Sequence, residues 1–181
     1  MFSRLSVELW GRPTWGGLDG MVTRSKDWFA LAGFLLLSYA VAGLGSLATI
    51  DNVRGWYATA DKPWFTPPNW LFGPVWTVLY GLIAVAAWLV WLRREQEPRQ
   101  VKVALAVWAV QLLLNLAWTP TFFGLQWLWA GFVVIVLLDV AVVATIVRFR
   151  RVRPVAAWLL APYLAWILYA SLLNAGVAAL N

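Results

Sequence analysis

Five long apolar stretches, separated by short polar segments, make up most of this sequence. They cover residues 28–50, 71–92, 103–123, 127–147 and 155–180. Each reaches the about 20 residues that a helix needs to cross the hydrocarbon core of a bilayer, and only the fourth contains a charged residue, Asp139. The alternation of polar and apolar residues that is typical of a membrane β-strand is absent. The pattern therefore predicts an all-α integral membrane bundle of five transmembrane helices over residues 28–181.

The composition also indicates that the solvent of this chain is a membrane. Hydrophobic residues make up 62% of the 181 residues and charged residues only 12%, which is far from the balance of a soluble domain. So few charges could not cover so much apolar surface in water. Residues 1–27 differ, because they mix arginine and acidic residues with glycine and proline, and we expect them to form a loosely ordered basic tail.

Positive charge is distributed unequally between the two sides of the predicted membrane domain. All but two of the 14 Lys and Arg residues lie in the tail, the second loop or the fourth loop: Arg4, Arg12, Arg24, Lys26, Arg93, Arg94, Arg99, Lys102, Arg148, Arg150, Arg151 and Arg153. The other side has only Arg54 and Lys62. This bias predicts an N-terminus inside and a C-terminus outside. Because the charges flank membrane spans in short turns, we exclude nucleic acid as a partner of this basic chain.

The first loop, residues 51–70, is rich in tryptophan and proline. Pro63, Pro67 and Pro68 each disfavour helix in the residue before them. A helix near residues 52–60 must therefore be short, and the rest of the loop should be extended and stiff. The tryptophans fit two interpretations, as anchors at the membrane surface or as part of a lid over a cavity between the helices, and composition alone favours anchors.

Polar and aromatic side chains share one face in three of the spans. Each of the following sets falls within roughly 60° to 80° on a helix: Trp76, Tyr80, Ile83 and Ala87; Gln111, Asn115, Trp118 and Phe122; Tyr163, Trp166, Ala170 and Asn174. Amides in hydrocarbon are costly unless they face protein, water or a ligand. Hydrogen bonds between helices and contact with a ligand explain these faces equally well.

Two prolines should interrupt the helices that carry these faces. Pro120 should free the carbonyl of Leu116 from the helical ladder, and Pro162 that of Trp158, because proline has no backbone N–H. The first span instead contains many small residues, among them the pair Ala42 and Ser46. We expect this pair to serve ordinary helix packing.

Conventional catalytic chemistry has no candidate residues here. The chain contains no cysteine and no histidine, which excludes disulfides and the commonest metal and haem ligands, so we expect neither a metal nor a resident cofactor. Phosphate-binding loops, dinucleotide fingerprints and carboxylate pairs are also missing. Asp139 is the one acidic residue within a span, and we expect it to be either protonated or paired with an amide.

Three groups of residues, taken in order, form a recognisable set of motifs. They are Trp56-Tyr57, Lys62-Pro63-Trp64, Pro67-Pro68, Pro74-Val75-Trp76 and Leu79-Tyr80; Gln111-Leu112, Asn115, Trp118, Pro120 and Phe122-Phe123-Gly124; and Pro162-Tyr163-Leu164-Ala165-Trp166, Ala170 and Leu173-Asn174. Over about residues 28–176 the chain resembles the TspO/MBR family. This family comprises the tryptophan-rich sensory proteins of bacteria and the mitochondrial translocator protein (peripheral benzodiazepine receptor).

The resemblance implies a homodimeric five-helix bundle in a bacterial cell membrane, with a pocket that opens toward the first loop. Family members bind porphyrins such as protoporphyrin IX, and many bind sterols or benzodiazepine-type drugs. Carried over to this chain, the ligand-binding residues are Tyr57, Trp76, Asn115, Trp118, Trp166, Ala170 and Asn174. Trp76 and Trp166 match the tryptophans that are linked to light-dependent porphyrin breakdown in bacterial relatives. The mammalian cholesterol-recognition stretch has no counterpart, because residues 175–181 contain neither Tyr nor Arg.

The sequence and the resemblance are consistent with three functions. The favoured one is a membrane protein that binds porphyrins and handles, transports or senses tetrapyrroles. The second is an enzyme that degrades porphyrin with light and oxygen, with Trp76 and Trp166 as its catalytic residues. The third is a proton-coupled transporter of small molecules that uses Asp139 as its titrating group. An absence of internal repeats counts against the third.

Overall fold

The structure, a computed structural model, describes residues 25–181, and within them it is built from helices and connecting turns. The expected tail lies outside the described residues except for its last three, which begin the first helix. The helices are α1 (Ser25–Arg54), α2 (Trp56–Thr59), the 3-10 turn η1 (Asn69–Leu71), α3 (Phe72–Trp91), α4 (Pro98–Thr119), the π-helical turn η2 (Pro120–Gly124), α5 (Leu128–Val152), α6 (Pro154–Leu159) and α7 (Ala161–Leu180).

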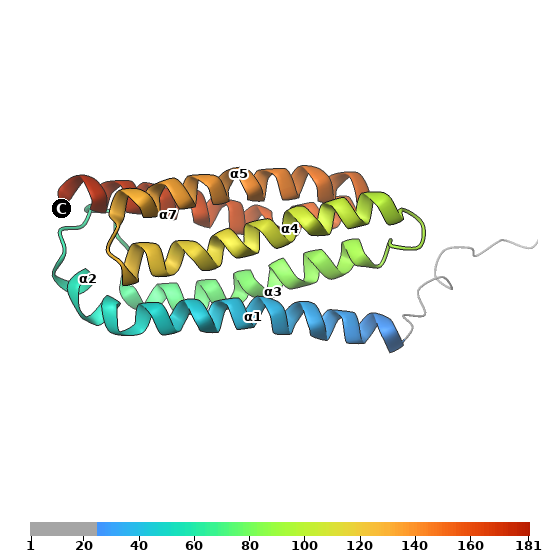
Figure 1. Cartoon of the computed structure of the whole chain (residues 1–181), viewed down its shortest axis with the longest axis horizontal. Coiled ribbons are helices and arrows are strands. Elements are labelled where there is room, and N and C mark those ends of the chain that lie inside the picture. Colours follow the sequence, from blue (N-terminus) through green and yellow to red (C-terminus); the bar gives the residue numbers. More distant parts are fainter. Residues whose placement is uncertain (1–24) are drawn as a thin grey trace, which may run out of the picture.

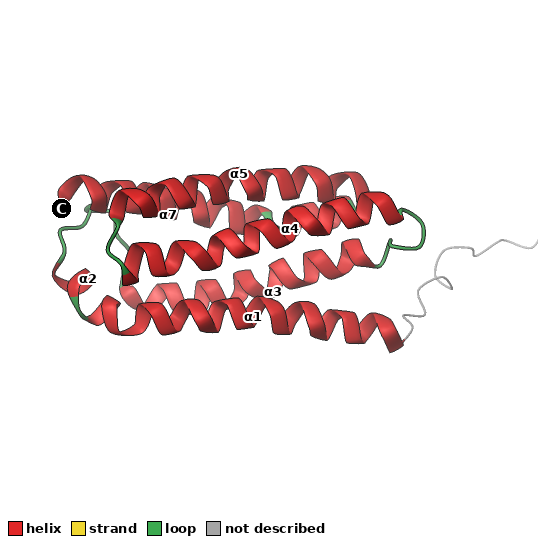
Figure 2. Ribbon diagram, in the orientation of Figure 1, coloured by secondary structure: helices red, strands yellow, loops and turns green. Residues whose placement is uncertain are grey.

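Five helical segments are long and apolar enough to cross a membrane, which confirms the predicted all-α bundle of five spans. The spanning helices run side by side along the long axis of the molecule (Figure 1). The turn between α3 and α4 lies at the same end as the start of α1, and α2 and the C-terminus lie at the opposite end. Helix dominates the described chain, and the longer loops lie at the two ends of the bundle (Figure 2).

The first helix is longer at both ends than the apolar pattern predicts. It begins at Ser25, where Asp27 in its first turn forms an ion pair with Arg94 at 3.1 Å. A carboxylate is favourable in a first helical turn because of the exposed N–H groups there. The helix continues through the polar residues that follow the apolar run and ends at Arg54. The first loop accordingly contains less free chain than its composition indicates.

Both interrupting prolines coincide with breaks in the helices. The α4 helix ends at Thr119, and a π-helical turn begins at Pro120, where the N–H of Leu125 donates to the Pro120 carbonyl at 2.8 Å. The fifth span is divided at Leu160 into α6 and α7, just before Pro162. The missing N–H of proline explains why the ladder changes at these two places.

The core lies along α3, α4, α5 and α7. It consists of small and branched aliphatic side chains with a few aromatic ones, among them Ala84, Ala87, Ile135, Leu138, Val142, Tyr163 and Ile167, all fully buried. Small side chains let membrane helices approach closely, and this close approach is the main source of helix association in lipid. The α1 helix is much less buried than the other spans, so it packs against the bundle more loosely.

Candidate functional site

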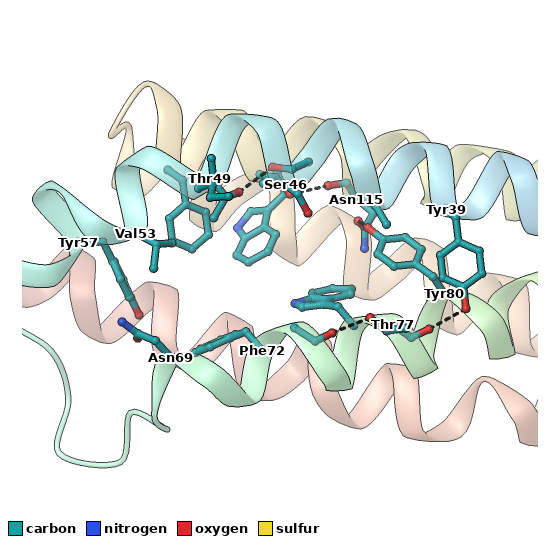
Figure 3. Close-up of a pocket in the computed structure, with 18 of the residues that line it drawn as sticks. Tyr39, Ser46, Thr49, Val53, Tyr57, Asn69, Phe72, Thr77, Tyr80 and Asn115 are labelled. Atoms are coloured by element: carbon teal, nitrogen blue, oxygen red, sulfur yellow. Dashed lines mark hydrogen bonds between the residues drawn. The ribbon is translucent and has the colours of Figure 1, made fainter.

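A cavity of about 420 Å³ lies between α1 on one side and α3 and α4 on the other. This volume is within the about 300–1,000 Å³ that small-molecule sites occupy. Tyr57 of α2 and Asn69 of η1 contribute at the loop end (Figure 3). Phe123 of η2, the turn that follows α4, also lines the cavity. The lining residues are Tyr39, Ala42, Gly45, Ser46, Thr49, Ile50, Val53, Arg54, Tyr57, Asn69, Phe72, Gly73, Trp76, Thr77, Tyr80, Asn115, Trp118, Thr119 and Phe123.

The α1 wall of the pocket is made of small and hydroxyl-bearing residues. Ala42, Gly45, Ser46 and Thr49 follow one another at helical spacing on the face toward the cavity. A Cβ added at Gly45 would lie 3.4 Å from the Thr119 hydroxyl of α4, so the two helices approach closely at this point. The small pair Ala42 and Ser46, for which the sequence predicts ordinary helix packing, also lines the cavity, and Ala42 packs against the core as well.

The opposite wall is aromatic. Trp76 and Tyr80 of α3 lie one above the other, with ring centroids 5.5 Å apart, and Trp118 of α4 stacks on Phe122 at 5.9 Å. Phe122 does not line the cavity but supports Trp118 from behind. Helices α3 and α4 and the first loop thus present flat aromatic surfaces to one space, which suits a flat apolar ligand.

A buried network of hydrogen bonds connects the pocket to α7. The Tyr80 hydroxyl donates to the side-chain oxygen of Asn115, and the Asn115 amide donates to the Tyr163 hydroxyl at 3.0 Å. Tyr163 in turn donates to Gln111 at 3.0 Å. The structure thus confirms that Gln111 and Asn115 bond between helices. Asn115 also lines the cavity, where its contact with a ligand stays a prediction.

The first loop closes one end of the pocket and is attached to the bundle. The Trp56 indole N–H donates to the Phe123 carbonyl at 2.9 Å, and the Tyr57 ring packs edge-on against Phe123 at 5.3 Å. The Lys62 ammonium donates to the carbonyls of Tyr57 at 2.7 Å and Ala60 at 2.8 Å, and so caps the short α2 helix.

The remainder of the loop is held by α7. The Tyr169 hydroxyl donates to the Phe65 carbonyl at 2.6 Å, and Pro63 packs directly against Gly176. The side chain of Asn181 exchanges two hydrogen bonds with the backbone of Asp61, at 3.0 and 3.2 Å. The loop is thus fixed to the same helix that carries the fifth-span motif.

The tryptophans of this loop differ in burial. Trp64 and Trp70 are 95% and 71% exposed, as anchors at a membrane surface would be. Trp56 is partly buried and bonded to η2, and its neighbour Tyr57 is buried and lines the pocket. Burial raises the pKa of the Tyr57 phenol, with the nearby Tyr169 as a smaller contribution, so this hydroxyl is neutral at physiological pH.

The seven predicted ligand-binding residues do not all reach the cavity. Tyr57, Trp76, Asn115 and Trp118 line it, whereas Trp166, Ala170 and Asn174 do not. Trp166 lies one layer further out, with its ring edge-on to Phe72 at 5.8 Å, and Ala170 is 6% exposed within the α7 packing. Asn174 accepts the indole N–H of Trp118 at 3.1 Å and donates to the Leu128 carbonyl at 2.9 Å. Asn174 therefore orients Trp118, which lines the pocket, but does not line the pocket itself.

The structure does not bring Asp139 to the pocket. Asp139 is buried on α5, and its carboxylate accepts a hydrogen bond from the Ser171 hydroxyl of α7 at 2.8 Å. It is absent from the cavity lining. The partner of this carboxylate is therefore a hydroxyl group, where the sequence analysis expects an amide.

The sequence alone did not identify several residues of the site. The pattern of the α1 face predicts packing, and nothing in the sequence distinguishes Arg54 or Asn69 from the other loop residues. The spacing of Ala42, Gly45, Ser46 and Thr49 was the available signal, since it places small side chains on one face. It could not show whether that face meets a helix or a cavity.

Fold and site together define a helical membrane protein with an aromatic-walled pocket between its spans and a loop fixed over one end. The sequence model of the TspO/MBR family matches residues 34–180, and the chain belongs to this family. It is 45% identical over 151 residues to the Tryptophan-rich protein TspO of Archaeoglobus fulgidus, covering 83% of this chain and 96% of that protein. It is 37% identical over 150 residues to the Translocator protein of Homo sapiens, covering 83% and 89%. The Tryptophan-rich sensory protein of Cereibacter sphaeroides is 36% identical over 157 residues, covering 87% and 94%.

Proposed function

We propose that this chain is a porphyrin-binding membrane protein that handles, transports or senses tetrapyrroles, with protoporphyrin IX as the representative ligand. The observation that carries the proposal is the convergence of aromatic rings from separate elements on one cavity. Trp76 from α3, Trp118 from α4 and Tyr57 from α2 all line it. Flat macrocycles are bound by stacking on such rings, and the pocket walls exclude water from their faces.

The polar groups of the pocket also suit this class of ligand. Asn115 lines the cavity, but its side-chain oxygen and nitrogen already bond to Tyr80 and Tyr163. Its main contribution to a ligand would therefore be the shape of the cavity wall. Hydroxyls of Ser46, Thr49 and Thr77 are distributed along the walls. Sterols and benzodiazepine-type drugs, which the family resemblance implies as further ligands, would compete with a porphyrin for the same cavity.

The test is a titration of the purified chain with protoporphyrin IX in the dark, read as quenching of tryptophan fluorescence. The informative variant is Ser46→Phe, which places a ring inside the cavity from the α1 wall. Its matched control is Leu47→Phe, because Leu47 is the next residue on α1 and is 75% exposed on the outer face. We expect saturable quenching that Ser46→Phe weakens at least tenfold and Leu47→Phe leaves unchanged. Equal affinity in both variants would place the ligand elsewhere.

A second candidate is the light- and oxygen-dependent degradation of porphyrin. The observation that favours it is the position of Trp76, whose indole lines the cavity and would lie against a bound macrocycle. Trp166, the other candidate catalytic residue, is separated from the cavity by Phe72. We expect Trp76→Phe to abolish product formation under illumination while binding is kept, and Trp166→Phe to have the smaller effect. The same reaction rate in both variants and the wild type would leave only uncatalysed photochemistry.

We also propose that the chain is a homodimer in a bacterial cell membrane, with its N-terminus inside and its C-terminus outside. The charge distribution supports the orientation, because the end of the bundle with the α3–α4 turn carries Arg93, Arg99 and Lys102, and α5 ends at the same side with Arg150 and Arg151. Single cysteines in the α3–α4 turn and in the first loop, treated with a membrane-impermeant thiol reagent in intact and in permeabilised cells, test the orientation. Light scattering of the detergent-solubilised protein tests the dimer.

A further inference from the structure

Arg54 is the last residue of α1, and it is the one charged residue that lines the cavity within the described part of the chain. We propose that its guanidinium recognises a carboxylate on the ligand, so that the site selects a rigid apolar molecule with an acidic edge. This inference rests on the proposed function and names the chemical feature by which the pocket distinguishes among flat apolar ligands.

The two cations at this end of the bundle have different surroundings. The Lys62 ammonium is engaged by backbone carbonyls, among them those of Tyr57 and Ala60, and lies 5.1 Å from the centre of the Tyr57 ring. Its charge therefore has a structural role in the loop. Arg54 forms no ion pair or side-chain hydrogen bond with any residue in 25–181, although Asp51 lies one turn earlier on the same helix. Its charge is available to a ligand.

The surroundings of Arg54 favour an anion at the end of the cavity. Acidic residues are missing from the lining within the described chain, so nothing in the pocket wall competes for the guanidinium. Tyr57 and Asn69, which lie opposite each other at the loop end of the cavity (Figure 3), supply a hydroxyl and an amide at that end. A guanidinium binds a carboxylate through two parallel hydrogen bonds, and neutral donors can satisfy the remaining lone pairs.

The polarity of the cavity changes along its length, and this change sets where the apolar and acidic groups of a ligand can lie. The α1 face from Tyr39 to Arg54 extends over roughly 22 Å at the helical rise of 1.5 Å per residue. Aromatic and small side chains line most of this length, and the cation lies at one end. A ligand with a flat apolar body and a carboxylate at its edge would satisfy both regions, whereas a fully apolar ligand would leave Arg54 unused.

A simpler role for Arg54 is that of a cation at a helix C-terminus, where it interacts favourably with the last carbonyls. That role affects helix stability but does not depend on which ligand is bound. The two roles are therefore separated by comparing ligands that differ only in charge.

The experiment uses protoporphyrin IX and its dimethyl ester, which share the macrocycle but differ in their carboxylates. Both are titrated in the dark against the full chain, Arg54→Gln, Arg54→Lys and the control Arg99→Gln, which removes one exposed positive charge at the opposite end of the bundle. We expect Arg54→Gln to weaken binding of the free acid by roughly two- to fivefold, the range for an exposed charge pair. Binding of the ester should stay unchanged, Arg54→Lys should fall between, and Arg99→Gln should match the wild type.

Because each variant is compared with the wild type for the same ligand, differences in how the two porphyrins partition into detergent cancel. Equal weakening of both ligands by Arg54→Gln, or of neither, would overturn the carboxylate role while leaving the porphyrin site in place. If neither porphyrin saturates the wild-type chain, the proposed function fails and the role of Arg54 fails with it.

Discussion

The indole N–H of Trp118 donates to the side-chain oxygen of Asn174 at 3.1 Å. This bond links a wall of the pocket on α4 to a helix that does not line the pocket. Asn174 is 1% exposed, and its amide is held in turn by the Leu128 carbonyl at 2.9 Å. The orientation of Trp118 therefore depends on a residue that a ligand does not touch.

Replacing Asn174 with alanine should weaken porphyrin binding although the side chain lies outside the cavity. The variant leaves a buried indole N–H without its acceptor, which costs about 1–3 kcal/mol of stability and allows the Trp118 ring to turn. Ser171→Ala, which also removes a buried hydrogen-bonding group from α7, is the control. Thermal unfolding and porphyrin titration should show that both variants lose stability but only Asn174→Ala loses affinity. Unchanged affinity in Asn174→Ala would mean that packing alone orients Trp118.

A methyl group at Gly176 should displace the first loop. An added Cβ would overlap Pro63, whose ring is rigid, so the loop would have to move. Gly43→Ala is a matched control on α1, because nothing lies within 4 Å of a Cβ added there, and it should be neutral or stabilising by up to about 1 kcal/mol. We expect Gly176→Ala to speed proteolysis within residues 61–70 and to weaken ligand binding. Identical cleavage rates in the two variants would show that the contact does not fix the loop.

Removing the Tyr80 hydroxyl should destabilise the bundle but leave the shape of the pocket almost unchanged. Tyr80→Phe keeps the ring beside Trp76 but leaves the Asn115 oxygen without its donor, at a cost of about 1–3 kcal/mol. Tyr39→Phe is the comparison, since that hydroxyl bonds an exposed backbone carbonyl at 3.0 Å and should cost less. Unfolding of both variants in the same detergent measures the difference, and an equal loss would contradict the burial argument.

Tyr57 should contribute to a loss of stability at alkaline pH. Burial raises its pKa in the folded chain above the usual value near 10. The folded state therefore holds this proton more tightly than the unfolded state. The resulting stabilisation is present in full below pH 10 and is lost as the pH rises through the folded pKa. Relative to the wild type, Tyr57→Phe should show a shallower decline in unfolding temperature between pH 9 and 11. Parallel declines would indicate that the pKa of Tyr57 is the same in the folded and the unfolded state.

How well the sequence predicts the site residues differs from helix to helix. Aromatic and amide residues such as Trp76 and Asn115 stand out in an apolar span because they are costly there without a partner. The α1 wall consists of small residues that occur equally at helix–helix contacts, and its contribution to the cavity depends on how far α1 stands from α3 and α4. Helical spacing defines faces, but it does not give the distances between helices.

The span pattern and the composition were sufficient for the membrane environment, the five helices and the breaks near Pro120 and Pro162. These properties follow from local chemistry: hydrocarbon requires long apolar helices, and proline lacks an N–H. The three-dimensional packing alone showed that Asn174 supports Trp118 from outside the pocket, that Asp139 pairs with Ser171 away from it, and that Arg54 lies at its edge. Each of these facts is a contact or a separation between residues far apart in the chain, and such relationships arise only when the helices pack against one another.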